Sequence, residues 1–241
     1  MKPFINYFGG KYRCAPMYPN PSFDVIIEPF AGAAGYSLRH YTKKVKLYEK
    51  YTDLILMWEF LIQASYDDIM YLPLEFEDIT KEDIPKGAQV LIGFLLNTGT
   101  TRPCLSKSKW AKEYSQTSQF WGEKRRSRIA EQVSKIKHWE IHKISDFSEI
   151  PNEKATWFID PPYQKQGIHY VHGSQDISFD SLGQWCLERK GEVIVCEQEG
   201  ADWLPWNSAK EIKGNNKTKT SKEVWYYAQQ TGIEGNSNAY P

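Results

Sequence analysis

The sequence predicts an α/β fold in which a parallel, doubly wound sheet is interrupted by a mainly helical insertion. Near the N-terminus, short apolar strand-like runs alternate with helix-like segments. The same alternation returns after residue 137, whereas residues 65–137 hold helix-like patches and a long polar stretch. We therefore expect one sheet domain built from residues 1–64 and 138–241, with residues 65–137 as an inserted subdomain.

The first part predicts two strands and two helices. Residues 25–28 (VIIE) form a short apolar strand that a proline ends. Residues 33–44 (AAGYSLRHYTKK) predict a helix that starts with small residues, and residues 45–49 (VKLYE) predict the second strand. A strongly apolar helix should follow over residues 52–65, with Thr52 as its N-cap.

The second part predicts one more helix and a closing antiparallel pair. The helix is expected at 179–190, and a basic loop (NNKTKTSK, 215–222) should join the last two strands. Strands are predicted over 138–144, 155–159, 192–198, 209–214 and 223–230.

The insertion concentrates positive charge. The chain has 30 basic and 30 acidic residues, yet residues 101–143 hold eleven Lys/Arg against four Glu. Residues 101–143 thus have a net charge of +7, and the rest of the chain has a net charge of −7. Such asymmetry is typical of a surface that binds a polyanion, although a solvated helical face fits the same count.

Composition predicts a cytoplasmic protein with no membrane segment and no metal site. No apolar run approaches the ~20 residues of a membrane span, and the N-terminus lacks the apolar core of a signal peptide. The four cysteines are far apart, which favours a reducing compartment over paired metal ligation.

Two glycine-containing motifs could contact a ligand through the backbone. The stretch EPFAGAAG (28–35) ends the first strand in a turn that can aim helix N–H groups at a ligand, and Glu49, 17 residues beyond Gly32, could accept from ribose hydroxyls. The stretch FGGK (8–11) could present backbone donors and a cation to a carboxylate. Each motif alone also fits an ordinary turn.

Two further motifs follow neighbouring predicted strands. In IDPPY, two prolines remove N–H donors and hold Asp160 extended, so its carboxylate and the carbonyls of Asp160 and Pro161 form a fixed set of acceptors. Such a set suits an amino group, which has two N–H donors, and Tyr163 could stack on the base that bears it. Asp146 and Phe147 offer an acceptor and an apolar face to an adenine ring. A Pro-Pro turn with Asp160 as a cap also explains the first motif, and a surface Asp followed by a core Phe also explains the second.

These motifs, in this order, resemble the Dam-type DNA adenine-N6 methyltransferases. The resemblance covers roughly residues 3–62 and 138–229, and it implies a Rossmann-like sheet, S-adenosylmethionine as cofactor, and double-stranded DNA as partner, with the target base flipped out. It assigns methyl acceptance to Asp160, Pro161 and Tyr163. It assigns cofactor binding to Tyr7, Gly9, Gly10, Lys11, Phe30, Gly32, Glu49, Asp146, Phe147 and Asp160.

The resemblance also makes the insertion the DNA-recognition segment. Basic side chains there are the expected contacts to phosphates and bases. They are Arg102, Lys107, Lys109, Lys124, Arg125, Arg126 and Arg128.

Some positions depart from the family pattern. Asn6 and Tyr7 stand where a basic residue and Trp usually precede the Gly-Gly-Lys, and Tyr51 replaces a short polar residue. Ala34 replaces the second glycine of the turn, which predicts a slightly repositioned turn with Gly35 compensating. Cytosine-N4, RNA or protein methylation, and a catalytically silent DNA-binding module, remain alternatives, and neither the target sequence nor the oligomeric state is predicted.

Overall fold

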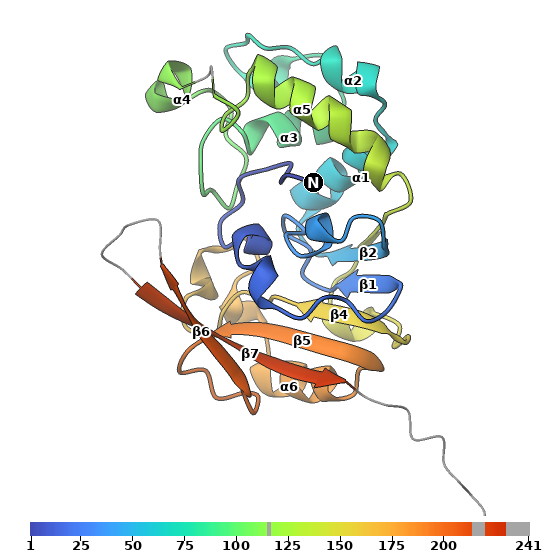
Figure 1. Ribbon diagram of the computed structural model, residues 1–241. Coiled ribbons are helices and arrows are strands. Elements are labelled where there is room, and N and C mark those ends of the chain that lie inside the picture. The colour runs from blue at the N-terminus through green and yellow to red at the C-terminus, as the bar shows by residue number, and fades with distance from the viewer. Residues whose placement is uncertain (115–116, 214–219, 230–241) are drawn as a thin grey trace, which may run out of the picture.

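A seven-stranded, mostly parallel sheet organises the protein. The computed structural model describes residues 1–114, 117–213 and 220–229. The strand order is β3-β2-β1-β4-β5-β7-β6, and only β7 runs antiparallel to its neighbours β5 and β6 (Figure 1). The strands are β1 Val25–Glu28, β2 Lys44–Glu49, β3 Glu140–Lys143, β4 Ala155–Ile159, β5 Gly191–Gln198, β6 Ser208–Lys213 and β7 Thr220–Gln229.

The strand order creates one position where the chain changes direction across the sheet. From β1 the chain builds outward through β2 to β3, and it then returns to place β4 on the other side of β1. In open α/β sheets, ligands bind in the crevice outside the carboxyl ends of the strands at such a switch point. The fold therefore places the ends of β1 and β4 beside the expected site.

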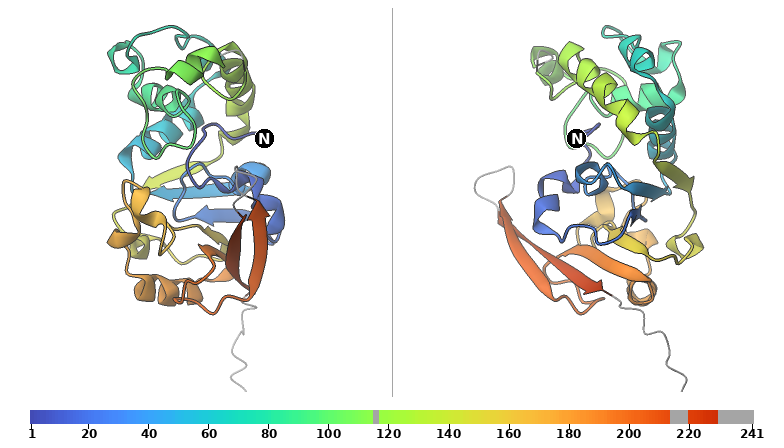
Figure 2. Two further views of the ribbon diagram at one scale, coloured as in Figure 1. Left: turned by 90° about the vertical axis from the view of Figure 1, so that its left-hand side faces the viewer. Right: turned by 45° about the vertical axis from the view of Figure 1, so that its right-hand side comes forward.

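The helices lie in two groups along the strand order of the sheet. Helices α1–α5 gather beyond β3, while α6 packs near β4 and β5 (Figures 1 and 2). They are α1 Thr52–Gln63, α2 Tyr66–Met70, α3 Lys86–Gly93, α4 Lys109–Glu113, α5 Glu123–Val133 and α6 Phe179–Leu187. Short 3-10 turns lie at Lys11–Arg13, Ala15–Met17, Ser37–Arg39, Ile79–Lys81, Ser134–Ile136, Phe147–Glu149, Gly167–His169 and Ser174–Asp176.

One hydrophobic core joins the sheet to the helices of residues 65–137. Trp58 of α1 packs edge-on against Phe4 at 5.9 Å between ring centroids, and it belongs to the same buried cluster as Trp121 and Ile129. A second cluster, which includes Trp157, lies between the sheet and α6. The helical segment is therefore packed directly on the sheet domain, and its described part contains no strand.

Most predicted strands and helices are confirmed, including β1 and β4 with their predicted bounds and the antiparallel β6–β7 pair. Residues 215–219 of the predicted basic loop lie outside the described residues, and its last three residues, 220–222, belong to β7. The expected helix over 33–44 is wrong, since only Ser37–Arg39 forms a single 3-10 turn. Helix α1 does begin at Thr52, but its N-cap is Tyr51, which makes no side-chain capping bond.

The missing helix has a local cause. Gly32 and Ala34 both have positive φ, +47° and +49°, which interrupts a helix at its start. Ala34 thus adopts the conformation that a glycine would favour. Gly35 does not take over that conformation and is instead required for space, because a Cβ there would lie 2.4 Å from the backbone nitrogen of Tyr12.

Candidate functional site

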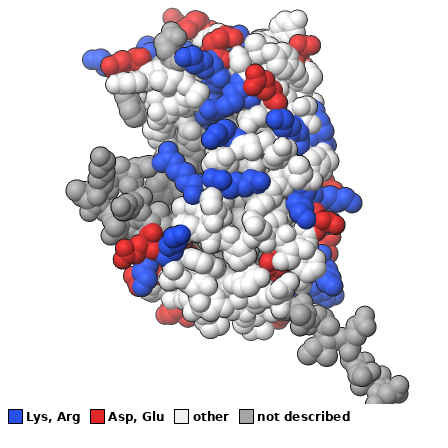
Figure 3. Space-filling view, viewed as in Figure 1, with Lys and Arg blue, Asp and Glu red and all other residues white. Residues whose placement is uncertain are grey.

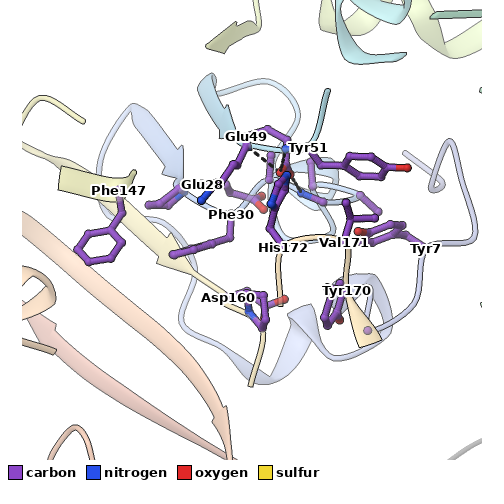
Figure 4. A pocket seen from close by; sticks show the side chains of 18 of the residues that line it. Tyr7, Glu28, Phe30, Glu49, Tyr51, Phe147, Asp160, Tyr170, Val171 and His172 are labelled. Atoms are coloured by element: carbon purple, nitrogen blue, oxygen red, sulfur yellow. Dashed lines mark hydrogen bonds between the residues drawn. The ribbon is translucent and has the colours of Figure 1, made fainter. Parts of the chain in front are cut away.

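One pocket lies at the carboxyl ends of β1, β2 and β4. Its walls come from the FGGK segment, the turn after β1, the end of β2, the segment after β3 and the end of β4. Figure 4 shows Phe30, Glu49, Asp160 and Tyr170 around this space, with Phe147 toward one end. All ten residues that the resemblance assigns to the cofactor line it: Tyr7, Gly9, Gly10, Lys11, Phe30, Gly32, Glu49, Asp146, Phe147 and Asp160.

Glu49 ties the end of β2 to the turn after β1. Its carboxylate accepts backbone N–H groups from Gly32 at 3.0 Å, Lys50 at 2.8 Å and Tyr51 at 2.9 Å. Burial raises its pKa, while these three donors act in the opposite direction. A carboxylate has about four acceptor sites, so Glu49 keeps capacity for a hydroxyl donor in the pocket.

The Gly32 turn is shaped for close approach. Gly32 has φ +47°, and a Cβ there would lie 3.5 Å from the ring of Tyr7. Its carbonyl accepts from the indole N–H of Trp58 at 2.9 Å, which fixes the turn on α1. The backbone around Gly32 is therefore rigid and uncovered by a side chain of its own.

Asp160 and Lys11 form a buried ion pair at the end of β4. The Lys11 Nζ lies 2.8 Å from Asp160 Oδ1 and donates to the carbonyl of Gly9 at 3.1 Å. Burial raises the pKa of Asp160 to about 6, although Lys11 opposes the shift. Burial by itself lowers the pKa of Lys11, but Asp160 and Glu223 outweigh it and the pKa is raised. Lys11 therefore stays charged beside an acid that titrates near neutrality.

The Asp160 carboxylate has unused acceptor capacity. Its Oδ1 is buried and receives no well-aligned hydrogen bond, despite the ion pair with Lys11. Lys11 is the one side-chain partner found for this carboxylate among the described residues, so Asp160, which lines the pocket, keeps acceptor sites for a donor from a ligand. Of the other acceptor residues, Pro161 and Tyr163 are not among the residues that line the pocket, whereas Pro162 is.

Tyr163 lies next to this ion pair instead of on the pocket wall. The Lys11 Nζ lies 4.6 Å from the centroid of the Tyr163 ring, within the range of a cation–π contact. The Tyr163 hydroxyl donates to Glu223 at 2.6 Å. Its expected stacking partner would have to approach the ring from the face opposite Lys11 or displace Lys11.

A segment that the sequence did not predict completes the pocket. Residues 170–173, with Asp176 and Ile177, cover its outer side. The Tyr170 hydroxyl donates to the carbonyl of Phe8 at 3.3 Å. Gly9 has φ +71°, and a Cβ there would lie 2.2 Å from the hydroxyl oxygen of Tyr170. Nothing in this polar, aperiodic stretch signals the contact, because it depends on how two distant segments meet.

Glu28 is a second residue that the sequence reading did not assign. It ends β1, is buried, and accepts the backbone N–H of Ser37 at 2.8 Å. Burial raises its pKa to about 8, so at neutral pH the protonated form predominates. An acid as the last residue of an otherwise apolar strand was the available signal.

The Asp146–Phe147 end of the pocket is organised locally. Asp146 caps the 3-10 turn Phe147–Glu149 and accepts from the backbone N–H of Ser148 at 2.9 Å. The Phe147 ring packs edge-on against Trp185 at 5.4 Å between centroids. A polar group and an apolar face therefore stand together, as expected.

The predicted DNA-contact residues divide into two groups. Arg102, Lys109 and Lys124 are exposed. Lys107 donates to the carbonyl of Leu74, and Arg126 and Arg128 donate to backbone carbonyls as well. These last three are half-buried.

Arg125 corrects the prediction most clearly. It is 3% exposed and donates to the carbonyls of Ser118, Pro3 and Phe4. A guanidinium has five N–H donors in a planar fork, which allows it to join α5 to two chain segments. In this structure Arg125 joins α5 to the residues just before FGGK, and it is not available on the surface for DNA.

The helices of the described residues include none with the length and hydrophobicity of a membrane-spanning segment. The same residues contain no cluster of three or more His, Cys, Asp or Glu side chains placed to bind a metal ion. A scan against protein-family models and a search of curated proteins gave no match to this chain.

Proposed function

We propose that this protein transfers a methyl group from S-adenosylmethionine to the N6 amino group of a flipped-out adenine in DNA. One observation carries the proposal: all ten positions that the resemblance assigns to the cofactor line one pocket at the switch point of the sheet. They come from five separate stretches of the chain. An accidental motif match would not be expected to bring them together.

The pocket fits the cofactor by three independent features. The backbone at Gly9 and Gly32 has positive φ and bears no side chain of its own, with the Tyr170 hydroxyl packed on Gly9 and the Tyr7 ring beside Gly32. Glu49 keeps acceptor capacity for ribose hydroxyls, and Asp146 with Phe147 suits an adenine ring. The buried charge also fits, because Asp160 titrates near neutrality and a cation nearby would favour its charged form.

The acceptor chemistry rests on Asp160. When bound, the cofactor supplies an electrophilic methyl group on a cationic sulfur. The exocyclic nitrogen of adenine is a weak nucleophile, since its lone pair is delocalised into the ring. Asp160 and the Pro161 carbonyl would accept hydrogen bonds from its two hydrogens and favour the tetrahedral nitrogen, so acceleration comes from orientation and fixed dipoles. The N–C bond would form as the S–C bond breaks, with the electron pair left on sulfur, and the methylated nitrogen would lose one proton to solvent. The rigid Pro161-Pro162 pair keeps these oxygens in place.

The helical segment of residues 65–137 supplies the proposed DNA contacts. Figure 3 shows Lys and Arg side chains over the helical half of this face, with acidic side chains among them. The exposed Arg102, Lys109 and Lys124 are the best-placed predicted contacts, and contacts to phosphates make affinity fall steeply with salt.

A paired substitution tests this surface. Lys124→Ala should weaken DNA binding and reduce the slope of log affinity against log salt by about 1. Arg125→Met should leave that slope unchanged and lower the melting temperature, because it removes an internal guanidinium. A salt slope that falls only in Arg125→Met would contradict the assignment of the surface.

The activity itself is tested with unmethylated genomic DNA. The protein and S-adenosylmethionine are incubated with this DNA, which is then sequenced by a method that detects modified adenines. Mass spectrometry of the nucleosides separates N6-methyladenine from N4-methylcytosine. Failure to bind the cofactor by calorimetry would refute the proposal and favour a silent DNA-binding module.

A further inference from the structure

Glu223 of β7 connects three segments that meet behind Asp160. One of its oxygens, Oε1, accepts the hydroxyl of Tyr18 at 2.5 Å and that of Tyr163 at 2.6 Å. The same oxygen lies 3.9 Å from the Nζ of Lys11. Glu223 is 8% exposed and lies 63 positions beyond Asp160, so no local sequence pattern links the two.

Both tyrosines are firm donors in this cluster. Burial raises the pKa of Tyr163 and of Tyr18 well above the usual range, so each hydroxyl keeps its proton. Charge-assisted hydrogen bonds to a carboxylate are shorter and stronger than neutral ones. Glu223 therefore holds the hydroxyl end of Tyr163 at a defined place.

The position of the Tyr163 ring matters because of what it contacts. The ring faces Lys11, and Lys11 pairs with Asp160. The backbone before Tyr163 is restricted by two prolines, so the torsions of its side chain are the main freedom left. The hydrogen bond from the Tyr163 hydroxyl to Glu223 removes that freedom. It keeps the Tyr163 ring, and the Lys11 ammonium that lies over it, in fixed positions beside Asp160.

We propose that Glu223 is a positioning residue for methyl transfer, which fixes Tyr163 and Lys11 around the Asp160 acceptor site. This inference rests on the proposed function. Strand pairing brings Glu223 close to Asp160. Glu223 lies opposite Gln198 at the carboxyl end of β5, and Asp160 follows the carboxyl end of the neighbouring strand β4. Glu223 itself is not among the residues that line the pocket.

The sheet provides a matched control in Glu192. This carboxylate is also buried and also accepts a tyrosine hydroxyl, from Tyr227 at 3.2 Å. It lies at the opposite end of β5, about 20 Å away along the strand at ~3.3 Å per residue. Glu192→Gln removes a buried carboxylate of the same sheet far from Asp160.

The experiment is a double-mutant cycle between Glu223→Gln and Tyr163→Phe, on DNA that the wild type methylates. We expect Glu223→Gln to lower kcat about 10- to 100-fold, as for a misplaced catalytic group. The Kd for S-adenosylmethionine from calorimetry should change less than about threefold, because the change acts on the transfer step. The double variant should be no slower than the slower single variant, since both remove one contact.

Three controls accompany this cycle. Glu223→Leu removes the acceptor oxygen that Gln retains, and it should be at least as slow as Glu223→Gln. Tyr18→Phe removes only the other donor, so its effect on kcat should be smaller than that of Tyr163→Phe. Glu192→Gln should lower the melting temperature and leave kcat within about twofold of the wild type.

The inference is overturned if kcat is unchanged in both Glu223 variants, if the two substitutions act independently, or if Glu192→Gln slows transfer as much. The same cycle is measured by denaturant unfolding without substrate. If the two substitutions are coupled in the free energy of unfolding but the wild type is inactive, the proposed function is refuted and the Glu223–Tyr163 contact is retained. Absence of coupling with an active wild type would refute only the role of Glu223.

Discussion

The two ends of the sheet each bury a carboxylate, and they treat it differently. At the amino ends of β4 and β5, Glu192 accepts from the backbone N–H and hydroxyl of Ser22, from Thr156 and from Tyr227. At the carboxyl end of β4, Asp160 has an ion pair with Lys11 and an oxygen without an aligned hydrogen bond. The same parallel strands thus carry a satisfied acid at one end and an unsatisfied one at the other.

This difference separates a structural role from a chemical one. A buried carboxylate with its acceptor sites filled stabilises packing and has nothing to offer a ligand. A buried carboxylate short of donors, with a raised pKa and a pocket in front of it, is typical of a functional site. Arg125 in the helix-rich region is a second example of a structural role, because it donates to three backbone carbonyls and has little left to offer a ligand.

The largest expected effect comes from removing the unsatisfied acid. If the protein acts as proposed, Asp160→Ala should lower kcat for methyl transfer at least ~10³-fold, because it removes the proposed acceptor of the amino hydrogens. Cofactor binding, measured by calorimetry, should be largely retained. Removing the satisfied acid by Glu192→Gln should do the reverse, with a loss of about 1–3 kcal/mol in the free energy of unfolding and little change in kcat.

The comparison breaks if these two variants behave alike. Equal losses of activity would mean that Asp160 acts through the fold and not through the acceptor site. Transfer at the wild-type rate by a folded Asp160→Ala protein would remove Asp160 from the chemistry.

A smaller effect should appear in the pH dependence. Asp160 has a pKa of about 6 in the free protein, and in the proposed transfer its carboxylate form is the stronger acceptor for the amino hydrogens. We expect kcat/KM to fall about tenfold per pH unit below pH ~6. The sign for stability is opposite: the folded state holds this proton more tightly than the unfolded state, so its contribution is full below about pH 4 and is lost as pH rises through about 6.

Glu192→Gln serves as the reference for this titration. Its kcat/KM profile should keep the wild-type midpoint, because Glu192 lies at the far end of β5. Bound cofactor brings a positive charge, so the midpoint of kcat should lie below that of kcat/KM. A midpoint in kcat/KM near pH 4, the ordinary range of an aspartate, would contradict the burial argument.

The sequence predicted the elements that depend on local pattern. Strands such as Ala155–Ile159 are continuous apolar runs between polar or turn-forming residues, and parallel strands buried on both faces require that pattern. Six of the ten assigned positions follow or end a strand whose carboxyl end the fold gathers in one place: Phe30, Gly32, Glu49, Asp146, Phe147 and Asp160. The FGGK segment follows no strand in the described part of the chain, so the strand pattern does not explain its place in the pocket.

What failed depends on contacts between distant segments. Ala34 breaks a helix that composition favours, since tight packing of the turn on Tyr12 overrides propensity. Tyr170 enters the site only because Gly9 leaves room for its hydroxyl. Arg125 and Arg126 are equally basic in the sequence, and only the fold shows that one of them is buried.

The smallest expected effect concerns Glu28, a buried acid with fewer hydrogen-bond donors than Glu192 and, in the described part of the chain, no ion pair like that of Asp160. Its carboxyl accepts one backbone N–H, and burial raises its pKa to about 8. The folded state therefore holds this proton more tightly than the unfolded state, and wild-type stability should decline as pH rises from about 4.5 through about 8. Glu28→Gln keeps an oxygen for Ser37 but has no proton to lose. Denaturant unfolding should show it gaining about 1 kcal/mol on the wild type between pH 7 and pH 8. Parallel curves for the two proteins would show that Glu28 is charged in the fold and is held by hydrogen-bond donors.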